Sequence, residues 1–257
     1  EIFVFKFDEG YLRSLSKDAI FLRQVHNGEP CKRVLLKMCY IGDDPFNAYR
    51  NEVEVHGPGL GDITTFVSSH SFSNEVEIQK EVFLTSNHHL QPITPNVYNV
   101  KILNEHPGSK EASNLLEHIS SNGTGEVRSR VESIKSRLEN VAKTIPRINS
   151  AIGCIFMEMR DGYEKLGDTF GRDPVSSEVM YIVGDTLKRL HKMGIVHGDL
   201  HQSNILYSNI DPRSMYKDGS ILLIDWGKAR RLAKKWEKRD SVKYETMLEL
   251  NATYKNF

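Results

Sequence analysis

Two carboxylates and one carboxamide stand beside short apolar segments in the C-terminal part of the sequence. Asp199 and Asn204 lie five positions apart in the string HGDLHQSNIL, and Asp225 follows the apolar run LLI. Because the segments around them read as short strands, the three side chains can converge on one point. Hard oxygen atoms from Asp and Asn suit Mg²⁺, which completes its shell with water and phosphate. The remaining Asp is then free to accept a proton from an attacking hydroxyl.

The two strings resemble the signature motifs of the protein-kinase-like superfamily. There the catalytic loop reads H-x-D-x-x-x-x-N and the metal motif reads D-[FW]-G, and this sequence has HGDLHQSN followed by DWG. The resemblance implies that Asp199 is the catalytic base, that Asn204 and Asp225 hold metal ions, and that His197 is a packing and hydrogen-bonding residue. ATP and Mg²⁺ are the implied cofactors.

An upstream lysine and a nearby glutamate match two further residues of such a site. Lys37, in the strand-like string VLLKM, matches the lysine that contacts the α and β phosphates of ATP. A lysine in an otherwise apolar strand needs a partner, and Glu75 in the following helix is the preferred candidate. Glu77 and Glu81 are rivals on the same helix, and Glu52, in the similar string NEVEV, is a less favoured one.

The string IFMEMR resembles the stretch that runs into the hinge between the two lobes of a kinase. The resemblance implies that Met157 is the gatekeeper, and that the Glu158 carbonyl and the Arg160 amide face the adenine edge. Backbone groups would make this contact, so the side chains at these positions carry little information about the ligand.

The predicted phosphate loop is poor in glycine. Residues 8–18 hold one glycine, Gly10, and three acidic side chains, whereas phosphates favour exposed backbone N–H groups and disfavour nearby carboxylates. Gly10 is the predicted cofactor contact in this loop. The alternatives are a cradle formed by Ser14, Ser16 and local amides, or a loop that does not bind phosphate.

The elements that must position these residues form an α+β pattern. On the N-terminal side of the motifs, strand-like strings cover residues 2–7, 19–25 and 32–40, and an antiparallel meander is the simplest arrangement of these strands. Residues 42–73 read mainly as a long connection and residues 104–125 as a polar stretch. Periodicity predicts the remaining strands at 97–103, 151–159, 205–207 and 220–224, and helices at 73–87, 126–143, 176–193 and in the final thirty residues.

The resemblance implies a bilobal, kinase-like fold of the α+β class. We expect an antiparallel-sheet N-terminal lobe with one key helix at 1–159, with insertions at about 42–73 and 105–147. A truncated, mostly helical C-terminal lobe is expected at 160–257. Only thirty residues follow DWG, without an A-P-E-like string. This favours an atypical protein serine/threonine kinase similar to the compact Bud32 and RIO kinases.

Two other functions stay open. The string HGDLH and the ending IDWG look like aminoglycoside and choline phosphotransferases, so a small-molecule kinase is the first alternative. Those families insert substrate-binding helices between hinge and catalytic loop, for which this sequence has little room. A nucleotide-binding scaffold with decayed activity is the second alternative, which the glycine-poor loop favours and the intact motifs oppose.

Composition and charge exclude several classes of protein. The 257 residues include 34 basic and 34 acidic side chains and are 39% hydrophobic, as in ordinary globular proteins. Three cysteines are too few for a disulfide framework, so a cytoplasmic or nuclear location is expected. No apolar run approaches the length of about 20 residues that crosses a bilayer, so no membrane partner is expected.

The expected partner is a protein substrate. Residues 228–239 hold seven basic side chains and one acidic one, so this segment is also a candidate surface for nucleic acid or an acidic partner. The alternative for the same segment is a solvated helix face.

Overall fold

The structure is a computed structural model, and it describes the chain in parts. Within the described part, no helix is both long enough and apolar enough to cross a membrane. Gly10, and the predicted strand at 19–25 apart from Val25, lie outside it. The described residues are 2–6, 25–26, 29–30, 33–43, 52–56, 63–87, 92–106, 109–144, 149–160, 162–170, 174–209, 219–231, 240–245 and 247.

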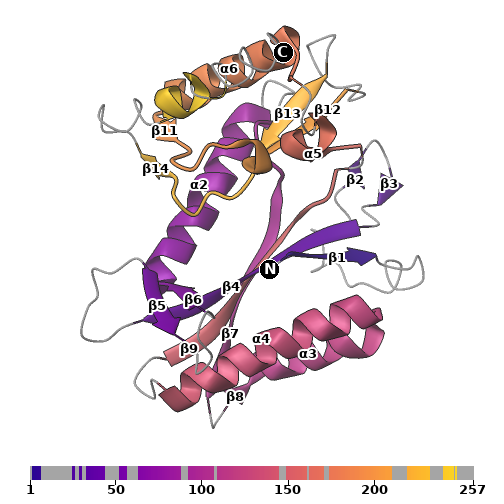
Figure 1. Cartoon of the computed structure of the whole chain (residues 1–257), viewed down its shortest axis with the longest axis vertical. Helices are drawn as coiled ribbons and strands as arrows, with labels where there is room; N and C mark the ends of the chain where they lie inside the picture. The colour runs from indigo at the N-terminus through magenta and orange to yellow at the C-terminus, as the bar shows by residue number, and fades with distance from the viewer. Residues whose placement is uncertain are drawn as a thin grey trace. The chain divides into compact units, whose positions relative to one another are not determined.

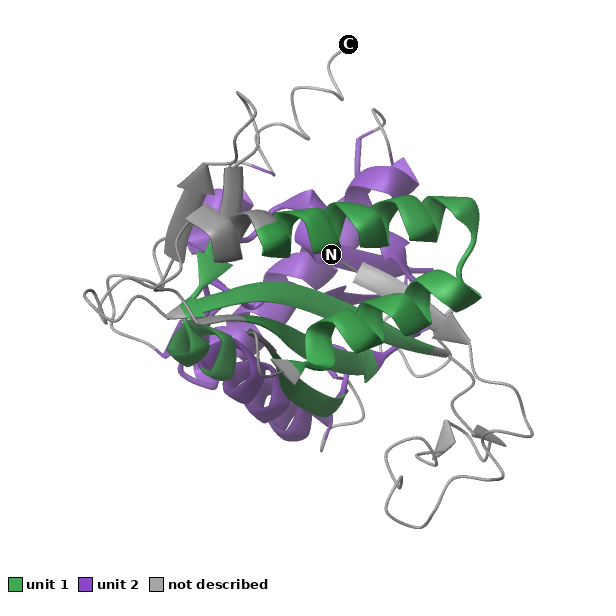
Figure 2. Cartoon of the chain, turned by 90° about the horizontal axis from the view of Figure 1, so that it is seen from below, with its two compact units in different colours: residues 1–73, 98–157 green, residues 74–97, 158–257 purple. Residues whose placement is uncertain are grey.

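The chain divides into two compact units by its internal contacts, coloured separately in Figure 2. Unit 1 comprises residues 1–73 and 98–157, and unit 2 comprises residues 74–97 and 158–257. The last of the three boundaries, between residues 157 and 158, therefore falls inside the string IFMEMR that resembles a kinase hinge. Residues 74–97, which the predicted lobes place in the N-terminal half, cluster with the C-terminal part of the chain. The lobe limits at 159 and 160 stay a prediction.

Unit 1 is built on a seven-stranded sheet in which antiparallel pairs dominate (Figure 1). Its strands are β1 (Ile2–Lys6), β4 (Arg33–Asp43), β5 (Glu52–His56), β6 (Ile63–Val67), β7 (Val97–His106), β8 (Ser109–Lys110) and β9 (Asn149–Glu158). The strand order is β5-β6-β4-β9-β7-β8, and β1 pairs with β4 off this path. Strands β4 and β6 meet in a parallel pairing at Ile41 and Val67. A separate antiparallel pair joins β2 (Val25–His26) and β3 (Glu29–Pro30).

Two helices, α3 (Glu111–Asn122) and α4 (Gly125–Thr144), bury apolar stripes in the core of unit 1. Along β4 the side chains alternate between the two faces of the sheet, so Leu36 and Met38 belong to this core while Lys37 lies on the opposite face. The helix residues of the core recur at helical spacing: Ala112, Leu116 and Ile119 on α3, and Val131, Ile134 and Leu138 on α4.

Unit 2 joins most of the long helix α2 (Ser69–Asn87) to the C-terminal part of the chain. Its other elements are α5 (Leu166–Phe170), α6 (Ser177–Lys192), the 3₁₀ turn η2 (Gln202–Asn204), β10 (Glu164–Lys165), β11 (Ile195–Val196), β12 (Ile205–Ser208), β13 (Ser220–Leu223) and β14 (Arg230–Arg231). Strands β10, β12 and β13 form one small sheet, and β11 pairs with β14. Helix α6 contributes a long apolar face to the core of this unit.

The ends of α6 follow from its sequence. Ser176 precedes the helix in extended conformation and accepts a hydrogen bond from the Val179 N–H at 3.2 Å, which satisfies a free donor of the first turn. After the last turn, Gly194 adopts φ +73°, a left-handed conformation that glycine reaches without strain. This glycine turns the chain into β11 and towards the catalytic-loop motif.

The predicted α+β class, with a mainly antiparallel sheet, is confirmed. The strands predicted at 32–40, 97–103, 151–159, 205–207 and 220–224 and the helices predicted at 73–87, 126–143 and 176–193 are all present within a few residues. The long connection predicted at 42–73 is wrong in part, because it contains the antiparallel pair β5 and β6 and the start of α2. The polar stretch at 104–125 contains α3, whose three buried residues are spaced by four and three positions. In the described part of the final thirty residues, 240–245 and 247 are helical as predicted, whereas Arg230–Arg231 form the strand β14.

Candidate active site

The catalytic-loop motif lies between β11 and η2 in unit 2. Gly198 adopts φ +78°, and a Cβ atom at this position would overlap the backbone carbonyl of Lys228. Glycine is therefore required both for the turn and for the close approach of the two backbone segments. The turn leaves the next side chain, Asp199, 27% exposed, while Leu200 is buried beneath the loop.

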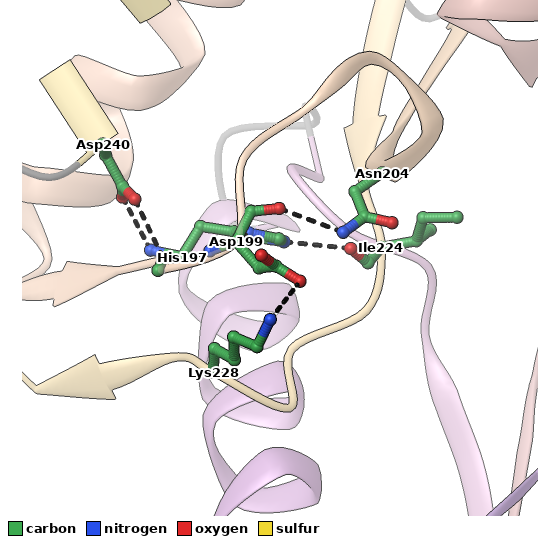
Figure 3. Close-up of polar contacts among 7 residues, drawn as sticks. His197, Asp199, Asn204, Ile224, Lys228 and Asp240 are labelled. Atoms are coloured by element: carbon green, nitrogen blue, oxygen red, sulfur yellow. Dashed lines mark hydrogen bonds and ion pairs between the residues drawn. The ribbon is translucent and has the colours of Figure 1, made fainter. Parts of the chain in front are cut away.

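Asn204 joins the catalytic loop to the segment that carries the metal motif. Its side-chain Nδ2 donates a hydrogen bond to the Asp199 carbonyl at 3.0 Å (Figure 3). Its backbone carbonyl accepts one from the Ile224 N–H at 3.0 Å. Because Nδ2 is used in this way, Oδ1 is the atom of the carboxamide that can offer lone pairs to a cation. The two predicted polar positions, 199 and 204, are thus rigidly related to each other and to the residue before Asp225.

His197 makes a second connection to the same segment. Its ring is fully buried, and Nε2 lies 2.9 Å from the Ile224 carbonyl. Since a carbonyl can only accept, Nε2 carries the proton and Nδ1 accepts from the Asp199 N–H at 3.4 Å. Burial lowers the pKa of His197 and outweighs its hydrogen bond and the nearby carboxylates, so the imidazole is neutral at pH 7. His197 is the packing and hydrogen-bonding residue that the motif predicted.

Asp240 anchors the backbone that leads into the loop. Its buried carboxylate accepts hydrogen bonds from the N–H groups of His197 at 2.7 Å and Gly198 at 2.8 Å (Figure 3). It also lies 3.3 Å from Nε2 of His191. Burial by itself would raise the pKa of Asp240. The hydrogen bonds from His191 and from the two backbone groups outweigh burial and hold the pKa below its usual value. The anchor is therefore a charged carboxylate at neutral pH.

Asp225 occupies an unusual backbone conformation. It has φ +66°, the only positive value outside glycine in the described part of the chain, and its side chain is exposed. Such a conformation costs about 1–3 kcal/mol and is found at functional sites. The next residue, Trp226, is buried and donates from Nε1 to the Thr94 hydroxyl at 3.0 Å. This buried indole holds the chain around Asp225 in place.

Helix α2 brings a glutamate to the metal motif. A Cβ atom placed on Gly227 would lie 3.6 Å from Oε2 of Glu75 and 3.8 Å from Oδ1 of Asp225. Glu75 is buried, whereas its rival Glu77 is exposed and its rival Glu81 forms an ion pair with Arg231. Of the three helix candidates for the partner of Lys37, Glu75 is therefore the one that lies beside Gly227 of the metal motif. The pairing of Glu75 with Lys37 stays a prediction.

The remaining predicted site residues, Lys37, Met157, Glu158 and Arg160, are divided between the two units. Lys37 lies in unit 1, at the centre of β4, opposite Ile2 of β1. Met157, at the end of β9, is buried. In unit 2 the Glu158 carboxylate lies 3.1 Å from Nε of Arg160. The adenine contacts predicted for the backbone at 158 and 160 stay a prediction, and Gly10 lies outside the described residues.

One contact at the site has no counterpart in the predictions. Nζ of Lys228 lies 3.1 Å from Oδ2 of Asp199 (Figure 3). The sequence shows Lys228 only as the first member of the basic segment 228–239, and Asp240 only as an acid after it. Neither residue belongs to a sequence motif that would mark it as part of the site. Both come close to the catalytic loop only when the chain folds. Within that basic segment, the structure describes residues 228–231.

A catalytic loop and a metal motif in this order, on neighbouring segments of one unit, fit the class of protein-kinase-like phosphotransferases. Residues 138–253 match the model of the Lipopolysaccharide kinase (Kdo/WaaP) family, which is part of that superfamily. The matched stretch contains Asp199, Asn204 and Asp225. The chain is thus similar to this family over its C-terminal part, and the similarity supports a kinase that uses ATP. No curated protein matches the chain.

Proposed function

We propose that the protein is an ATP- and Mg²⁺-dependent phosphotransferase that transfers the γ-phosphoryl group to a hydroxyl. The observation that carries the proposal is the hydrogen-bonded frame of the loop. Asn204 and His197 both bind the backbone of Ile224, so that the predicted base and the predicted metal ligands come from one rigid arrangement. Preorganisation of this kind is the main requirement of phosphoryl transfer, in which positioning and charge stabilisation dominate.

The residues at the metal motif fit a hard divalent cation. Oδ1 of Asn204 and the exposed carboxylate of Asp225 are oxygen donors, and Mg²⁺ is bound through few protein oxygens together with water and phosphate. Among the described residues, no cluster of three or more His, Cys, Asp or Glu side chains could hold a metal by itself. When bound with ATP, the cation would neutralise phosphate charge.

Each remaining site residue has a role in this proposal. Asp199 orients the acceptor hydroxyl and accepts its proton. Lys37 neutralises the α and β phosphates, and Glu75 supports the metal motif from α2. The backbone at Glu158 and Arg160, next to the gatekeeper Met157, binds adenine.

The acceptor that we favour is a hydroxyl of a sugar or another small molecule, because the matched family is named for lipopolysaccharide kinases. A protein serine or threonine hydroxyl, as in the Bud32 and RIO kinases, is the second candidate, since residues 158–196 leave little room for the substrate-binding helices that small-molecule kinases insert before the catalytic loop. This second candidate implies a protein substrate and a cytoplasmic or nuclear location. It also includes a role of residues 228–239 in binding acidic partners or nucleic acid.

The proposal is tested by replacing the base. The full chain is incubated with γ-labelled ATP and Mg²⁺, first with water and then with panels of sugars and of proteins as acceptors. Asp199→Asn should reduce the turnover about 10²–10⁴-fold, because the carboxamide cannot accept the proton, and should leave ATP binding unchanged. Asp168→Asn, which replaces an exposed carboxylate on α5, is the matched control and should transfer phosphate like the wild type.

Two results would contradict the proposal. If Asp199→Asn has the turnover of the wild type, Asp199 is not the base. If the wild type binds ATP without Mg²⁺ and transfers no phosphate to water or to any acceptor, the protein is a nucleotide-binding scaffold. The panel that accepts the label decides between the small-molecule and the protein acceptor.

A further inference from the structure

We propose that Lys228 is a catalytic residue whose ammonium group binds the transferred phosphoryl group beside Asp199. This inference rests on the proposed function and assigns to it a cation that neither the motifs nor the family match identify. The starting point is the 3.1 Å distance between Nζ of Lys228 and Oδ2 of Asp199.

The pair is accessible to a ligand. Lys228 is 48% exposed and Asp199 is 27% exposed, so neither group is enclosed by protein. An exposed ion pair contributes little to stability, because water and salt screen it and because two side chains lose rotational freedom. The stability of the fold therefore does not explain why a lysine is held at this place.

The backbone that carries Lys228 is fixed against the catalytic loop. The close approach at Gly198 places the Lys228 carbonyl directly against the residue before Asp199. The strands β11, which precedes Gly198, and β14, which follows Lys228, form an antiparallel pair in which Val196 lies opposite Arg230. This pairing also holds the segment of Lys228 against the catalytic loop. The N–H of Ala229 donates to the Trp226 carbonyl at 2.9 Å and closes the turn after the metal motif. Lys228 is thus positioned by the same elements that position the base and the metal ligand.

The negative charges at the site favour a cation at this position. Asp199 and Asp225 are carboxylates, and the γ-phosphate of ATP brings further negative charge towards them. An ammonium group within 4 Å of the base reduces this repulsion, and it can donate hydrogen bonds to phosphate oxygens as a compact point charge. Lys228 differs from Arg231 in its partner. Lys228 contacts one oxygen of the predicted base Asp199, whereas the guanidinium of Arg231 is bound by both carboxylate oxygens of Glu81.

The reaction step is balanced as follows. The acceptor hydroxyl gives its proton to a carboxylate oxygen of Asp199 while its oxygen forms a bond to the γ-phosphorus. The bond between this phosphorus and the β,γ-bridging oxygen breaks, and ADP leaves with the electron pair. Lys228 takes no part in the proton transfer and donates hydrogen bonds from Nζ to a non-bridging oxygen of the phosphoryl group, where charge must be stabilised in the transition state.

The test compares Lys228→Met with Lys228→Arg in the full chain. Transfer of labelled γ-phosphate to water is measured in single turnovers, and binding of ADP and of a non-hydrolysable ATP analogue is measured with Mg²⁺. We expect Lys228→Met to lower the rate about 10²–10³-fold and to weaken binding of the analogue but not of ADP, since only the analogue has a γ-phosphate. Lys228→Arg, which keeps the charge, should recover part of the transfer rate and part of the binding of the analogue. Lys188→Met removes an exposed lysine of α6 and should behave like the wild type.

The possible failures are distinguishable. If the wild type transfers phosphate and Lys228→Met transfers it at the same rate, the proposed function stands and the role of Lys228 is wrong. The same holds if Lys228→Met is faster, because Lys228 would then block the base. If ADP and the analogue weaken equally, Lys228 does not contact the γ-phosphate. If the wild type binds neither nucleotide, the proposed function itself is wrong, and this inference with it.

Discussion

The cores of the two units differ in kind. The helical hairpin and sheet of unit 1 are held by apolar side chains such as Leu36, Leu116 and Val131. Every polar or charged side chain that is buried in the described part of the chain belongs to unit 2. These side chains are Glu75, Gln79, Ser86, Thr94, Glu158, Thr186, His197, Asn204, Ser208 and Asp240.

The difference shows how a fold can hold a polar site in place. A buried polar group is costly unless it is hydrogen-bonded, and the buried groups around the catalytic loop have partners with definite directions. Asp240 accepts hydrogen bonds from two backbone N–H groups. His197 donates to the Ile224 carbonyl, and Asn204 donates to the Asp199 carbonyl. Apolar packing is not directional, so it can stabilise unit 1 but could not set the orientation of single groups. Substitutions in the two cores should therefore have different consequences.

The largest loss of stability is expected in the apolar core of unit 1. Leu116→Ala removes a fully buried side chain of α3 and should lower the free energy of unfolding by about 2–5 kcal/mol, because it leaves a cavity. The turnover per folded molecule should stay that of the wild type. Urea unfolding and single-turnover phosphate transfer measure the two quantities. Ile102→Ala, at an exposed position of β7, is the control and should change neither.

A smaller loss of stability with a loss of activity is expected at the polar anchor. The N–H groups of His197 and Gly198 bond different oxygens of Asp240. Asp240→Asn replaces one of these oxygens by an NH₂ group, which cannot accept from the N–H group that it faces. It should lower the free energy of unfolding by about 1–3 kcal/mol. The displaced loop should also lower the turnover about 100-fold, since an error of 1 Å in position is enough for this effect.

The matched control for the anchor is Asp168→Asn, which removes a charge from an exposed site of the same unit. If Asp240→Asn loses stability but turns over normally, the anchor is structural only and the contrast between the two cores is wrong. If Leu116→Ala loses turnover per folded molecule as strongly as Asp240→Asn, the apolar core of unit 1 also positions the site, and the contrast between the two cores is wrong.

The smallest effect is a pH dependence of stability that arises from His197. Its folded-state pKa lies below its unfolded value, so the unfolded chain binds the extra proton first as the pH falls. Stability is therefore fully present above the unfolded pKa of about 6.5 and declines towards lower pH, by at most about 1.4 kcal/mol per pH unit. His197→Gln should make the decline between pH 7 and pH 5 shallower. His201→Gln leaves His197 in place, so the decline of the wild type should remain. An equal decline in all three proteins would mean that His197 is not a buried neutral group.

Part of the site was predictable because its signal is local. The strings HGDLHQSN and DWG place Asp199, Asn204 and Asp225 at fixed offsets from short apolar segments, and these segments are the strands β11, β12 and β13. The periodicity of 176–193 likewise predicted α6 with its apolar face. The strands β5 and β6 and the helix α3 were missed although their patterns are present, because the Gly, Ser and Asn residues around the two strands and within and around the helix favour turns and loops.

The sequence by itself determined the residue types of the site, the order of its motifs and the α+β class, since each depends on neighbours along the chain. Only the tertiary structure decided that Asp240 holds the loop, that Glu75 lies beside Gly227 and that Lys228 reaches Asp199. These contacts join residues that are distant in sequence or turned towards each other by a specific backbone path. An acid or a lysine in a charged segment carries no local mark of the partner it will meet, because that partner is set by the packing of the whole unit.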